Sequence, residues 1–404
     1  MLIAALFFLF FGRIIFLFGF VISAAYIQTG EKGVIKNYTG QELPFISVLI
    51  SSRNNGRNIY STIQSICESG YENSRMEVLV CDDLSTDDTS FWIKKAALDF
   101  QDVRSFKNNY NLGKLFSIRR ISQYAKGELF VTIDADSYID HGSLQRLIEG
   151  FESLNVGAIG GRIAVKNHSS SLLTNFQISL YVNTFFIRRA LESKLGNTQC
   201  ISGSFFGIRK CVYEKIWADI KTTHYVGGYF DVFGEDRFLT YKTLTLGYDT
   251  KINNNAICYT QVPNTLFGFF KQQLRWHKGA WRINYIILAN IMGVIKLGAI
   301  RSLLLTLPCF LWILRVSVIA FILLSNNFYD NLILTLLFSI LLSPTYILAA
   351  YFFLFDRELE RPYSSLNFFL AIMVIGPLWY LFDALLVIPF ALFSLDVPNS
   401  VARN

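Results

Sequence analysis

Gly234 to Arg282 reads GEDRFLTYKTLTLGYDTKINNNAICYTQVPNTLFGFFKQQLRWHKGAWR, and this stretch joins an acidic segment to an amphipathic one. It opens on the carboxylates of Glu235 and Asp236 and contains Arg275 and Trp276 near its end. A carboxylate can accept a proton, and an arginine can bind an anion. We therefore expect an active site here, where a cytosolic domain meets a membrane.

The composition places the chain between soluble and membrane proteins. Of its 404 residues 52% are hydrophobic and 17% are charged, which is too apolar for a soluble enzyme and too polar for a bundle of membrane helices alone. The net charge of +7 fits anionic lipid headgroups or an anionic substrate. No basic stripe typical of nucleic-acid binding is present. The six cysteines show no CxxC spacing, which excludes a disulfide framework and a zinc site.

Apolar runs predict a multi-pass membrane protein. Four segments are long enough to cross a bilayer: Leu2–Ile27, Leu303–Leu324, Leu332–Phe355 and Phe368–Phe393. The first lacks a basic start and a small-residue cleavage site, so we interpret it as an anchor rather than a signal peptide. The loop 356–362 has two arginines and the loop 326–331 has none, so the positive-inside rule places the region between the first two segments in the cytosol. Asp383, inside the last segment, is either a functional residue or part of a kinked helix beside a polar neighbour.

The cytosolic region alternates in type. Five short runs rich in β-branched residues are separated by helix-like segments: Phe45–Ile50, Glu77–Cys81, Val103–Phe106, Glu128–Ile133 and Val156–Val165. This order predicts an α/β domain with a mostly parallel sheet and helices on both faces. Ligands of such sheets bind at the carboxyl ends of the strands.

Polar residues follow the predicted strands. Ser52 and Asn54 come at the end of the first strand, and Asp82 and Asp83 at the end of the second. Acidic side chains there can accept hydrogen bonds from a uracil or a ribose. The alternative is that DDLSTDDT is only a loop that leads into a capped helix. Lys114 lies at a predicted helix start, where it can contact a phosphate or a base.

The next strand ends in a second acidic motif. Asp134 and Asp136 follow ELFVTI, and a bend after the strand lets one carboxylate bind a divalent metal directly while the other acts through water or ribose. Hard oxygen ligands prefer Mg²⁺ or Mn²⁺, which would neutralise a diphosphate leaving group. A single motif of this kind is common in proteins.

The ordered motifs together are more specific. They are Asp82-Asp83, Asp134-Ala135-Asp136, Gly234-Glu235-Asp236 and Gln272-Gln273-Leu274-Arg275-Trp276, flanked by apolar segments. In this order they resemble the processive family 2 glycosyltransferases, which include bacterial hyaluronan, cellulose and chitin-oligosaccharide synthases. The resemblance covers about Phe45 to Arg282 by motif. It implies a GT-A fold, with a Rossmann-like, mostly parallel sheet in the cytosol and an α-helical transmembrane bundle.

The resemblance also implies a role for each motif residue. It assigns donor and nucleotide binding to Ser52, Asn54, Asp82, Asp83, Lys114, Asp134, Gln272 and Arg275. It assigns acceptor contacts to Ser202, Gly203, Glu235 and Trp276, and it places Mg²⁺ or Mn²⁺ on Asp136 and Asp134. Asp236 matches the general base. Gln272, Arg275 and Trp276 lie within about one helical turn, so one amphipathic helix at the membrane surface can present all three.

Three places depart from the family pattern. Ser204 stands where hyaluronan-type members usually have proline. Arg53-Asn54-Asn55 replaces the usual asparagine–acid pair after the first strand. Near the C-terminus, Ser400-Val401-Ala402-Arg403 stands where relatives often show Trp-Gly-Thr-Arg, so we expect altered gating of the site.

The expected domains are an anchor over 1–28, a GT-A domain over 44–262, interface helices over 263–300, three transmembrane helices over 301–394 and a tail over 395–404. The implied protein is a multi-pass enzyme of a bacterial inner membrane. It would use UDP-N-acetylglucosamine, alone or with UDP-glucuronate or UDP-glucose, to extend and export a β-linked capsular polysaccharide. Expected partners are the UDP-sugar, the polysaccharide and membrane lipid, without nucleic acid; a homo-oligomer or an export partner is left open. The alternatives are a single-addition ceramide or polyprenyl-phosphate glycosyltransferase and a non-catalytic membrane scaffold.

Overall fold

The computed structural model describes residues 43–167, 171–220, 234–327, 329–330, 333, 375, 378–379 and 382–394. They divide into two compact units. The sheet unit contains the described residues of Val34–Lys166 and Glu192–Gln261, and the helical unit contains those of Asn167–Leu191 and Val262–Val397. The segment Asn167–Leu191 lies inside the predicted GT-A domain but belongs to the helical unit.

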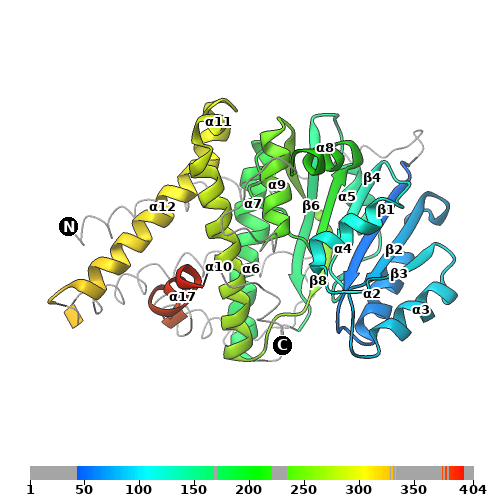
Figure 1. Cartoon of the computed structure of the whole chain (residues 1–404), viewed down its shortest axis with the longest axis horizontal. Helices are drawn as coiled ribbons and strands as arrows, with labels where there is room; N and C mark the ends of the chain where they lie inside the picture. Colours follow the sequence, from blue (N-terminus) through cyan, green and yellow to red (C-terminus); the bar gives the residue numbers. More distant parts are fainter. Residues whose placement is uncertain are drawn as a thin grey trace. The chain divides into compact units, whose positions relative to one another are not determined.

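The sheet unit is built on one mixed sheet of eight strands in the order β3-β2-β1-β4-β7-β6-β8-β5 (Figure 1). The strands are β1 Ile46–Ser52, β2 Met76–Asp82, β3 Val103–Lys107, β4 Leu129–Ile133, β5 Tyr138–Ile139, β6 Val156–Val165, β7 Phe205–Arg209 and β8 Asp249–Thr260. Its helices are η1 Asn73–Arg75, α2 Asn58–Cys67, α3 Thr89–Asp99, α4 Gly113–Ser122, α5 Ser143–Glu149, α8 Lys210–Ile220 and α9 Glu235–Thr245. The five strands predicted from apolar runs are all present.

The sheet is parallel except at β7 and β5. Strand β1 pairs in parallel with β2 and β4, and β3 pairs in parallel with β2. Every residue of β2 is buried, as expected for a central strand covered on both faces. Strand β6 also pairs in parallel with β8, so the prediction of a mostly parallel sheet holds for six of the eight strands; β7 runs antiparallel to both of its neighbours and β5 runs antiparallel to β8. The loop 202–204 therefore precedes a strand, whereas its sequence suggests that it follows one.

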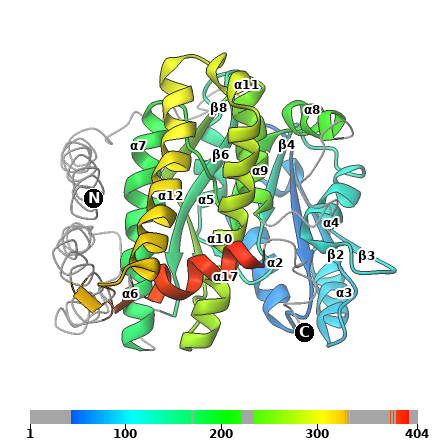
Figure 2. The ribbon, with the colours of Figure 1, turned by 60° about the vertical axis from the view of Figure 1, so that its left-hand side comes forward.

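The helical unit is organised around one long helix, α10 Leu266–Ala289. The other elements are α6 Leu172–Tyr181, the π-helix η2 Val182–Arg188, the start of α7 Arg189–Lys194, α11 Ile291–Ile295, α12 Ala299–Leu324, the π-helix η4 Asp383–Val387 and α17 Ile388–Phe393. The Thr265 hydroxyl caps α10 by accepting from the N–H of Gly268 at 3.1 Å, a contact that typically stabilises a helix by about 1 kcal/mol. Short α11 links α10 to α12, and α17 lies across α10 (Figure 2).

One helix in the described part of the chain is long and apolar enough to cross a membrane. It is the stretch Ala299–Ile322 of α12, and it coincides with the second predicted span. The predicted spans Leu2–Ile27 and Leu332–Phe355, and the first part of Phe368–Phe393, lie outside the described residues apart from a few positions. The transmembrane bundle as a whole therefore stays a prediction.

Candidate functional site

The carboxyl ends of the parallel strands form one edge of the sheet unit. Ser52 at the end of β1 pairs in register with Asp82 at the end of β2, which pairs with Lys107 at the end of β3. Ser52 is fully buried, and its hydroxyl accepts from the side-chain amide of Asn55 at 3.1 Å. The first predicted donor-site residues thus lie side by side at the edge where ligands of parallel sheets bind.

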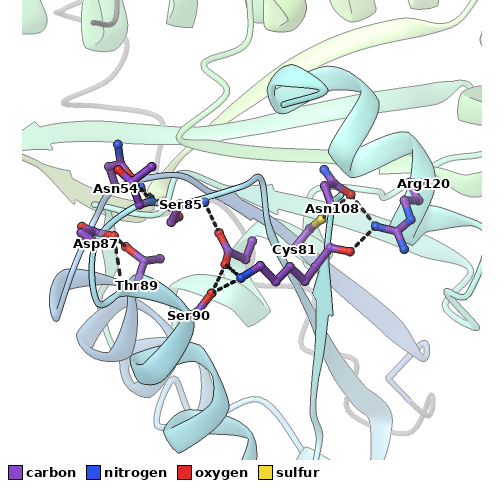
Figure 3. A network of polar contacts seen from close by, with 11 residues as sticks. Asn54, Cys81, Ser85, Asp87, Thr89, Ser90, Asn108 and Arg120 are labelled. Carbon is purple, nitrogen blue, oxygen red and sulfur yellow. Dashed lines mark hydrogen bonds and ion pairs between the residues drawn. The ribbon is translucent and has the colours of Figure 1, made fainter. Parts of the chain in front are cut away.

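Asp82 is engaged by its own loop. The side chain is 2% exposed, and its Oδ1 accepts from the N–H of Ser85 at 2.9 Å. Its Oδ2 accepts from the Ser90 hydroxyl and lies 3.9 Å from Nζ of Lys107 (Figure 3). Asp82 therefore holds the loop between β2 and α3 in shape, as the alternative interpretation of DDLSTDDT expects.

Asp83 fixes the start of helix α4. It is 2% exposed, and its Oδ1 accepts at 2.8 Å from the side-chain amide of Asn108 and from the N–H of Leu112. Its Oδ2 accepts from the N–H of Gly113, also at 2.8 Å. These contacts satisfy N–H groups that have no partner within the helix. The helix that carries Lys114 is thereby anchored to the end of β2.

Two non-glycine residues in these loops have left-handed backbone angles. Asn54 has a φ of 53° and Leu84 has a φ of 60°. The exposed Asn54 is held by neighbouring contacts, since its N–H donates to Ser85 Oγ at 3.1 Å and its Oδ1 accepts from the N–H of Thr86 at 2.9 Å (Figure 3). Strained backbone positions of this kind persist only where the surrounding structure enforces them, and they are common at binding sites. These hydrogen bonds therefore join the loops after β1 and β2, which together form one wall of the candidate site.

Lys114 connects two predicted site carboxylates. Its Nζ lies 2.5 Å from Asp134 Oδ1 and 2.9 Å from Glu235 Oε1, and it donates to the carbonyl of Gly203 at 3.4 Å. Burial acts to lower the pKa of Lys114, but the charges of Asp134 and Glu235 outweigh it and raise the pKa well above its ordinary value. The ammonium is therefore charged at neutral pH.

The remaining contacts bring in the loop before β7. The Ser204 hydroxyl donates to Asp134 Oδ2 at 2.7 Å, and the N–H of Gly203 donates to Asp236 Oδ2 at 3.2 Å. The N–H of Arg237 donates to Asp236 Oδ1 at 2.7 Å, and Asp236 is half-buried. We call the residues Lys114, Asp134, Gly203, Ser204, Glu235 and Asp236 the strand-end cluster.

The direction of β7 explains how this loop reaches the cluster. Because β7 is antiparallel to β4, it begins where β4 ends, and Phe205 pairs with Ile133. A Cβ on Gly203 would lie 2.8 Å from the Lys114 ammonium. A residue other than glycine therefore fits at position 203 only if the lysine side chain moves. Ser202, two residues before Ser204, is also buried here.

Helix α9 supplies the acidic pair. Gly234 precedes the helix in a left-handed conformation with a φ of 77°, which glycine adopts without steric cost. Glu235 and Asp236 therefore occupy the first helical turn, where the helix dipole favours negative charge. The carboxylate of Asp236 is oriented and still partly open to solvent.

Asp136 is the candidate metal ligand that faces solvent. It is exposed, whereas Asp134 is held by Lys114 and Ser204. The pKa of the Cys258 thiol is raised by burial, and the negative charges of Asp134 and Asp136 raise it further. Within the described ranges no group of three or more His, Cys, Asp or Glu side chains is placed to hold a metal. This donor set fits Mg²⁺ or Mn²⁺, which proteins often hold through one or two carboxylates together with substrate phosphates and water.

The helical unit carries the other predicted residues. As predicted, Gln272, Arg275 and Trp276 lie on a single helix, α10. Gln272 is buried, and its Oε1 has no hydrogen-bond partner among the residues that the structure describes. Arg275 is exposed, and Trp276 is 41% exposed with its ring 5.9 Å from the ring of Tyr181 and 6.3 Å from that of Phe185. Because these residues belong to the helical unit, their approach to the strand-end cluster stays a prediction.

Two residues of the site were missed in the assignment from sequence. Ser204 contacts Asp134 directly, and Asn108 links Asp83 to α4. A signal existed for Asn108, because it follows the end of β3 at the same sheet edge as the predicted residues. Ser204 offered no comparable signal, since its contact depends on the reversed direction of β7.

Comparison with known proteins finds a family model that matches part of the chain. Residues 47–217 match the model of glycosyl transferase family 2. The chain is 28% identical to an N-acetylglucosaminyltransferase of Azorhizobium caulinodans over 59% of this chain and 60% of that protein. It is 27% identical to a hyaluronan synthase of Streptococcus pyogenes over 61% and 59%, and 30% identical to an N-acetylglucosaminyltransferase of Rhizobium meliloti over 62% and 59%. The matches thus span 59–60% of the length of these relatives.

A solved structure supports the fold. A mannosyltransferase from Pyrobaculum calidifontis, in complex with GDP-Man and Mn²⁺, superposes with a TM-score of 0.56 over 88% of each chain at 18% identity. The predicted GT-A-like, Rossmann-type domain is confirmed, and its mixed sheet has six strands in one direction and two, β5 and β7, in the other. The resemblance to family 2 glycosyltransferases predicted from the motifs is also confirmed.

Proposed function

Because residues 47–217 form a family 2 glycosyltransferase domain, we propose that this protein is a membrane-embedded, inverting, processive glycosyltransferase. It transfers sugars from UDP-sugars to a growing β-linked polysaccharide. The observation that supports the proposal is the strand-end cluster, in which the ammonium of Lys114 contacts Asp134 and Glu235 while the neighbouring Gly203 donates its N–H to Asp236. Three segments distant in sequence thus place a candidate base beside a candidate donor site.

Asp236 is the proposed general base. Its two oxygens accept from the N–H groups of Gly203 and Arg237, which fixes the plane of the carboxylate while its half-exposed position leaves it accessible. It takes the proton of an acceptor hydroxyl as that oxygen bonds to the anomeric carbon. The bond from this carbon to the diphosphate oxygen breaks on the opposite face, and UDP leaves with the electron pair. Such a displacement converts an α-linked donor into a β-linked product.

Charge balance argues for a cation in the donor site. Lys114 contacts the carboxylates of Asp134 and Glu235, and those of Asp136 and Asp236 lie at the same end of the sheet unit. An anionic diphosphate cannot bind beside them without further positive charge. A bound Mg²⁺ or Mn²⁺ would neutralise the diphosphate leaving group. We assign its binding to Asp136 together with Asp134, and the Mn²⁺ in the Pyrobaculum calidifontis mannosyltransferase complex is consistent with this choice.

The donor-site aspartates act by shaping the pocket. The contacts of Asp82 hold the loop after β2, and those of Asp83 hold the start of α4. We assign the uridine to the wall that these loops form with Ser52 and Asn54. In this arrangement the two buried carboxylates fix the backbone that meets the nucleotide.

Helix α10 provides the proposed acceptor platform. The partly exposed ring of Trp276 is supported by the aromatic rings of Tyr181 and Phe185, which suits stacking on a sugar. Arg275 would bind the diphosphate, for which a guanidinium is well matched. Gln272 is buried on the same helix, and its Oε1 has no hydrogen-bond partner in the described part of the chain.

Export through the membrane completes the proposal. Only 22% of the most apolar window of α12 is buried within the protein, so this helix does not behave as the core helix of a soluble domain. A hydrophilic polymer cannot cross hydrocarbon unaided, which explains why a polymerase would carry its own spans. We propose UDP-N-acetylglucosamine as donor, alone or with UDP-glucuronate or UDP-glucose, because the relatives are named N-acetylglucosaminyltransferase and hyaluronan synthase.

The test uses the purified full chain in detergent or lipid nanodiscs. Each labelled UDP-sugar, singly and in pairs, is incubated with Mg²⁺, with Mn²⁺ or with EDTA, and the product is sized on a gel and digested with linkage-specific hydrolases. We expect a long water-soluble β-linked polymer that disappears with EDTA. One sugar on a chloroform-soluble lipid would instead identify a lipid glycosyltransferase. No UDP release with any donor would favour a non-catalytic scaffold.

A further inference from the structure

A buried charge network joins three elements of the helical unit. Asp383, the first residue of η4, lies with its Oδ1 2.7 Å from Nε2 of His277 on α10. Its Oδ2 accepts from Nη2 of Arg315 on α12 at 2.6 Å. One carboxylate therefore bonds to α10 and α12, two helices that also pack on each other through the rings of Trp281 and Trp312.

The network lies in apolar surroundings. The side chains of Asp383 and His277 are 7% and 13% exposed, and that of Arg315 is 30% exposed. The ring of Trp312 stands 5.0 Å from the imidazole of His277. Removing one partner of a buried ion pair leaves an uncompensated charge, which is strongly unfavourable. Asp383 therefore holds both partners at fixed distances. The sequence left two alternatives for this residue, a functional carboxylate or a kinked helix beside polar neighbours.

The position of His277 gives the network its consequence. His277 follows Trp276 directly and lies two residues after Arg275 on the same continuous helix. Each residue of an α-helix is related to the next by a fixed rotation and a 1.5 Å rise. A contact that fixes His277 against α12 and η4 therefore fixes the rotation and the axial position of Trp276 and Arg275 as well.

The other contacts of α10 are less directional. Phe269 packs on Trp379 with ring centroids 4.3 Å apart, and Phe270 packs on Phe382 and Phe390 at 5.8 Å and 6.2 Å. Apolar packing tolerates small rotations and shifts, because the hydrophobic effect depends on buried area and not on direction. The hydrogen bonds of Asp383 supply the direction that the aromatic contacts lack.

We propose that Asp383, through His277 and Arg315, is a positioning residue for the Gln272–Trp276 motif. This inference rests on the proposed function, in which Arg275 and Trp276 contact the donor diphosphate and the acceptor sugar. The substrates concerned are those of the proposed reaction, a UDP-sugar and the growing polysaccharide. Asp383 itself touches neither substrate.

The experiment compares Asp383→Asn with Asp330→Asn in the full-length protein in nanodiscs. Both changes remove one carboxylate from the helical unit, but Asp330 is exposed. The readouts are kcat and KM for sugar transfer, UDP affinity, product length, and hydrogen–deuterium exchange of the α10 amides. Arg315→Lys, which keeps a cation, and Arg315→Met, which removes it, provide a conservative pair for the same contact.

For Asp383→Asn we expect kcat to fall between about tenfold and a hundredfold, since a misplacement on the order of 1 Å can cost about a hundredfold. The product should be shorter, the amides of 272–280 should exchange faster, and UDP affinity should fall as well, because Arg275 is the proposed ligand of the diphosphate. Arg315→Met should behave like Asp383→Asn, and Arg315→Lys should recover part of kcat.

Three results would overturn the inference. These are kcat and exchange equal to those of Asp330→Asn, a UDP affinity equal to that of the wild type, or Arg315→Lys as impaired as Arg315→Met. A wild-type protein that transfers no sugar would sink the proposed function instead. In that case the exchange of α10 decides by itself whether Asp383 positions this helix, so a variant with unchanged exchange refutes the positioning role.

Discussion

Asp82 and Asp83 are 2% exposed and accept hydrogen bonds, Asp82 from its own loop and Asp83 from the start of α4, whereas Glu235 and Asp236 lie half-buried in the strand-end cluster. Both pairs consist of two adjacent carboxylates at the carboxyl edge of one sheet. The buried pair holds the backbone of the proposed pocket, and the partly open pair keeps oxygens within reach of a substrate. Adjacent acids at a sheet edge can therefore serve architecture or chemistry, and their burial separates the two.

The largest effect is expected for Asp236→Asn. The amide keeps the shape of the side chain but cannot take the acceptor proton, so kcat for sugar transfer should fall by about a thousandfold or more. UDP release and polymer formation from labelled UDP-sugars measure it. The matched control is Asp140→Asn, which changes an exposed aspartate outside the strand-end cluster. Polymer synthesis by Asp236→Asn at the wild-type rate would remove the assigned base.

Lys114→Met should rank second. Loss of the ammonium leaves Asp134 and Glu235 without the charge that both contact, so the anionic donor meets uncompensated carboxylates. We expect kcat/KM for the UDP-sugar to fall by about a hundredfold, which corresponds to about 2.7 kcal/mol. Lys114→Arg, which preserves the charge, should lose much less. If Met and Arg at this position gave equal activity, the charge of Lys114 would have no role in donor binding.

Asp83→Asn should act on stability more than on the chemical step. The amide can no longer accept from Leu112, Gly113 and Asn108 together, and buried donors left unpaired cost about 1–3 kcal/mol. We expect the Tm to fall by on the order of 5 °C, measured by a thermal shift of the purified protein. Asp236→Asn should leave the Tm almost unchanged. A reversed order of the two Tm values would contradict the division between an architectural and a chemical pair.

The smallest effect concerns Cys81, the residue before the buried pair. Burial raises the pKa of this thiol to about 12, so at pH 8 only about one molecule in 10⁴ carries the reactive thiolate. Cys211 is exposed. Maleimide at pH 8 should modify Cys211 within minutes and Cys81 only after denaturation, as read by peptide mass spectrometry. Rapid labelling of Cys81 in the native protein would show that the end of β2 beside Asp82 becomes accessible to solvent.

Local signals account for much of the fold. The runs that predict β1, β2, β3, β4 and β6 are short and rich in β-branched residues, and the observed strands agree within about two residues at each end. Strand β8 carries the polar run Lys251–Asn255 and escaped prediction, because its half-buried pattern resembles a loop. The direction of β7 depends on pairing with residues far away in the chain, which no local pattern encodes.

The candidate site shows the same limit. The sequence assigned Lys114, Asp134, Glu235 and Asp236 to the site, but it did not indicate that the Lys114 ammonium contacts both Asp134 and Glu235. Likewise, the sequence marked Asp383 as unusual without indicating that His277 and Arg315, 106 and 68 residues away, are its partners. Residue identity follows from chemistry along the chain, whereas pairing follows from the three-dimensional path.

The reversal of β7 separates two kinds of change. The loops that would recognise the nucleotide follow the ends of the parallel strands β1 to β3. The Ser202–Ser204 loop instead precedes β7, which runs antiparallel to its neighbour β4. Under the proposed roles, exchange of this loop alone would alter which sugar chain is extended and leave the choice of nucleotide intact. Acceptor specificity can then diverge among related synthases independently of donor chemistry, as a modular trait.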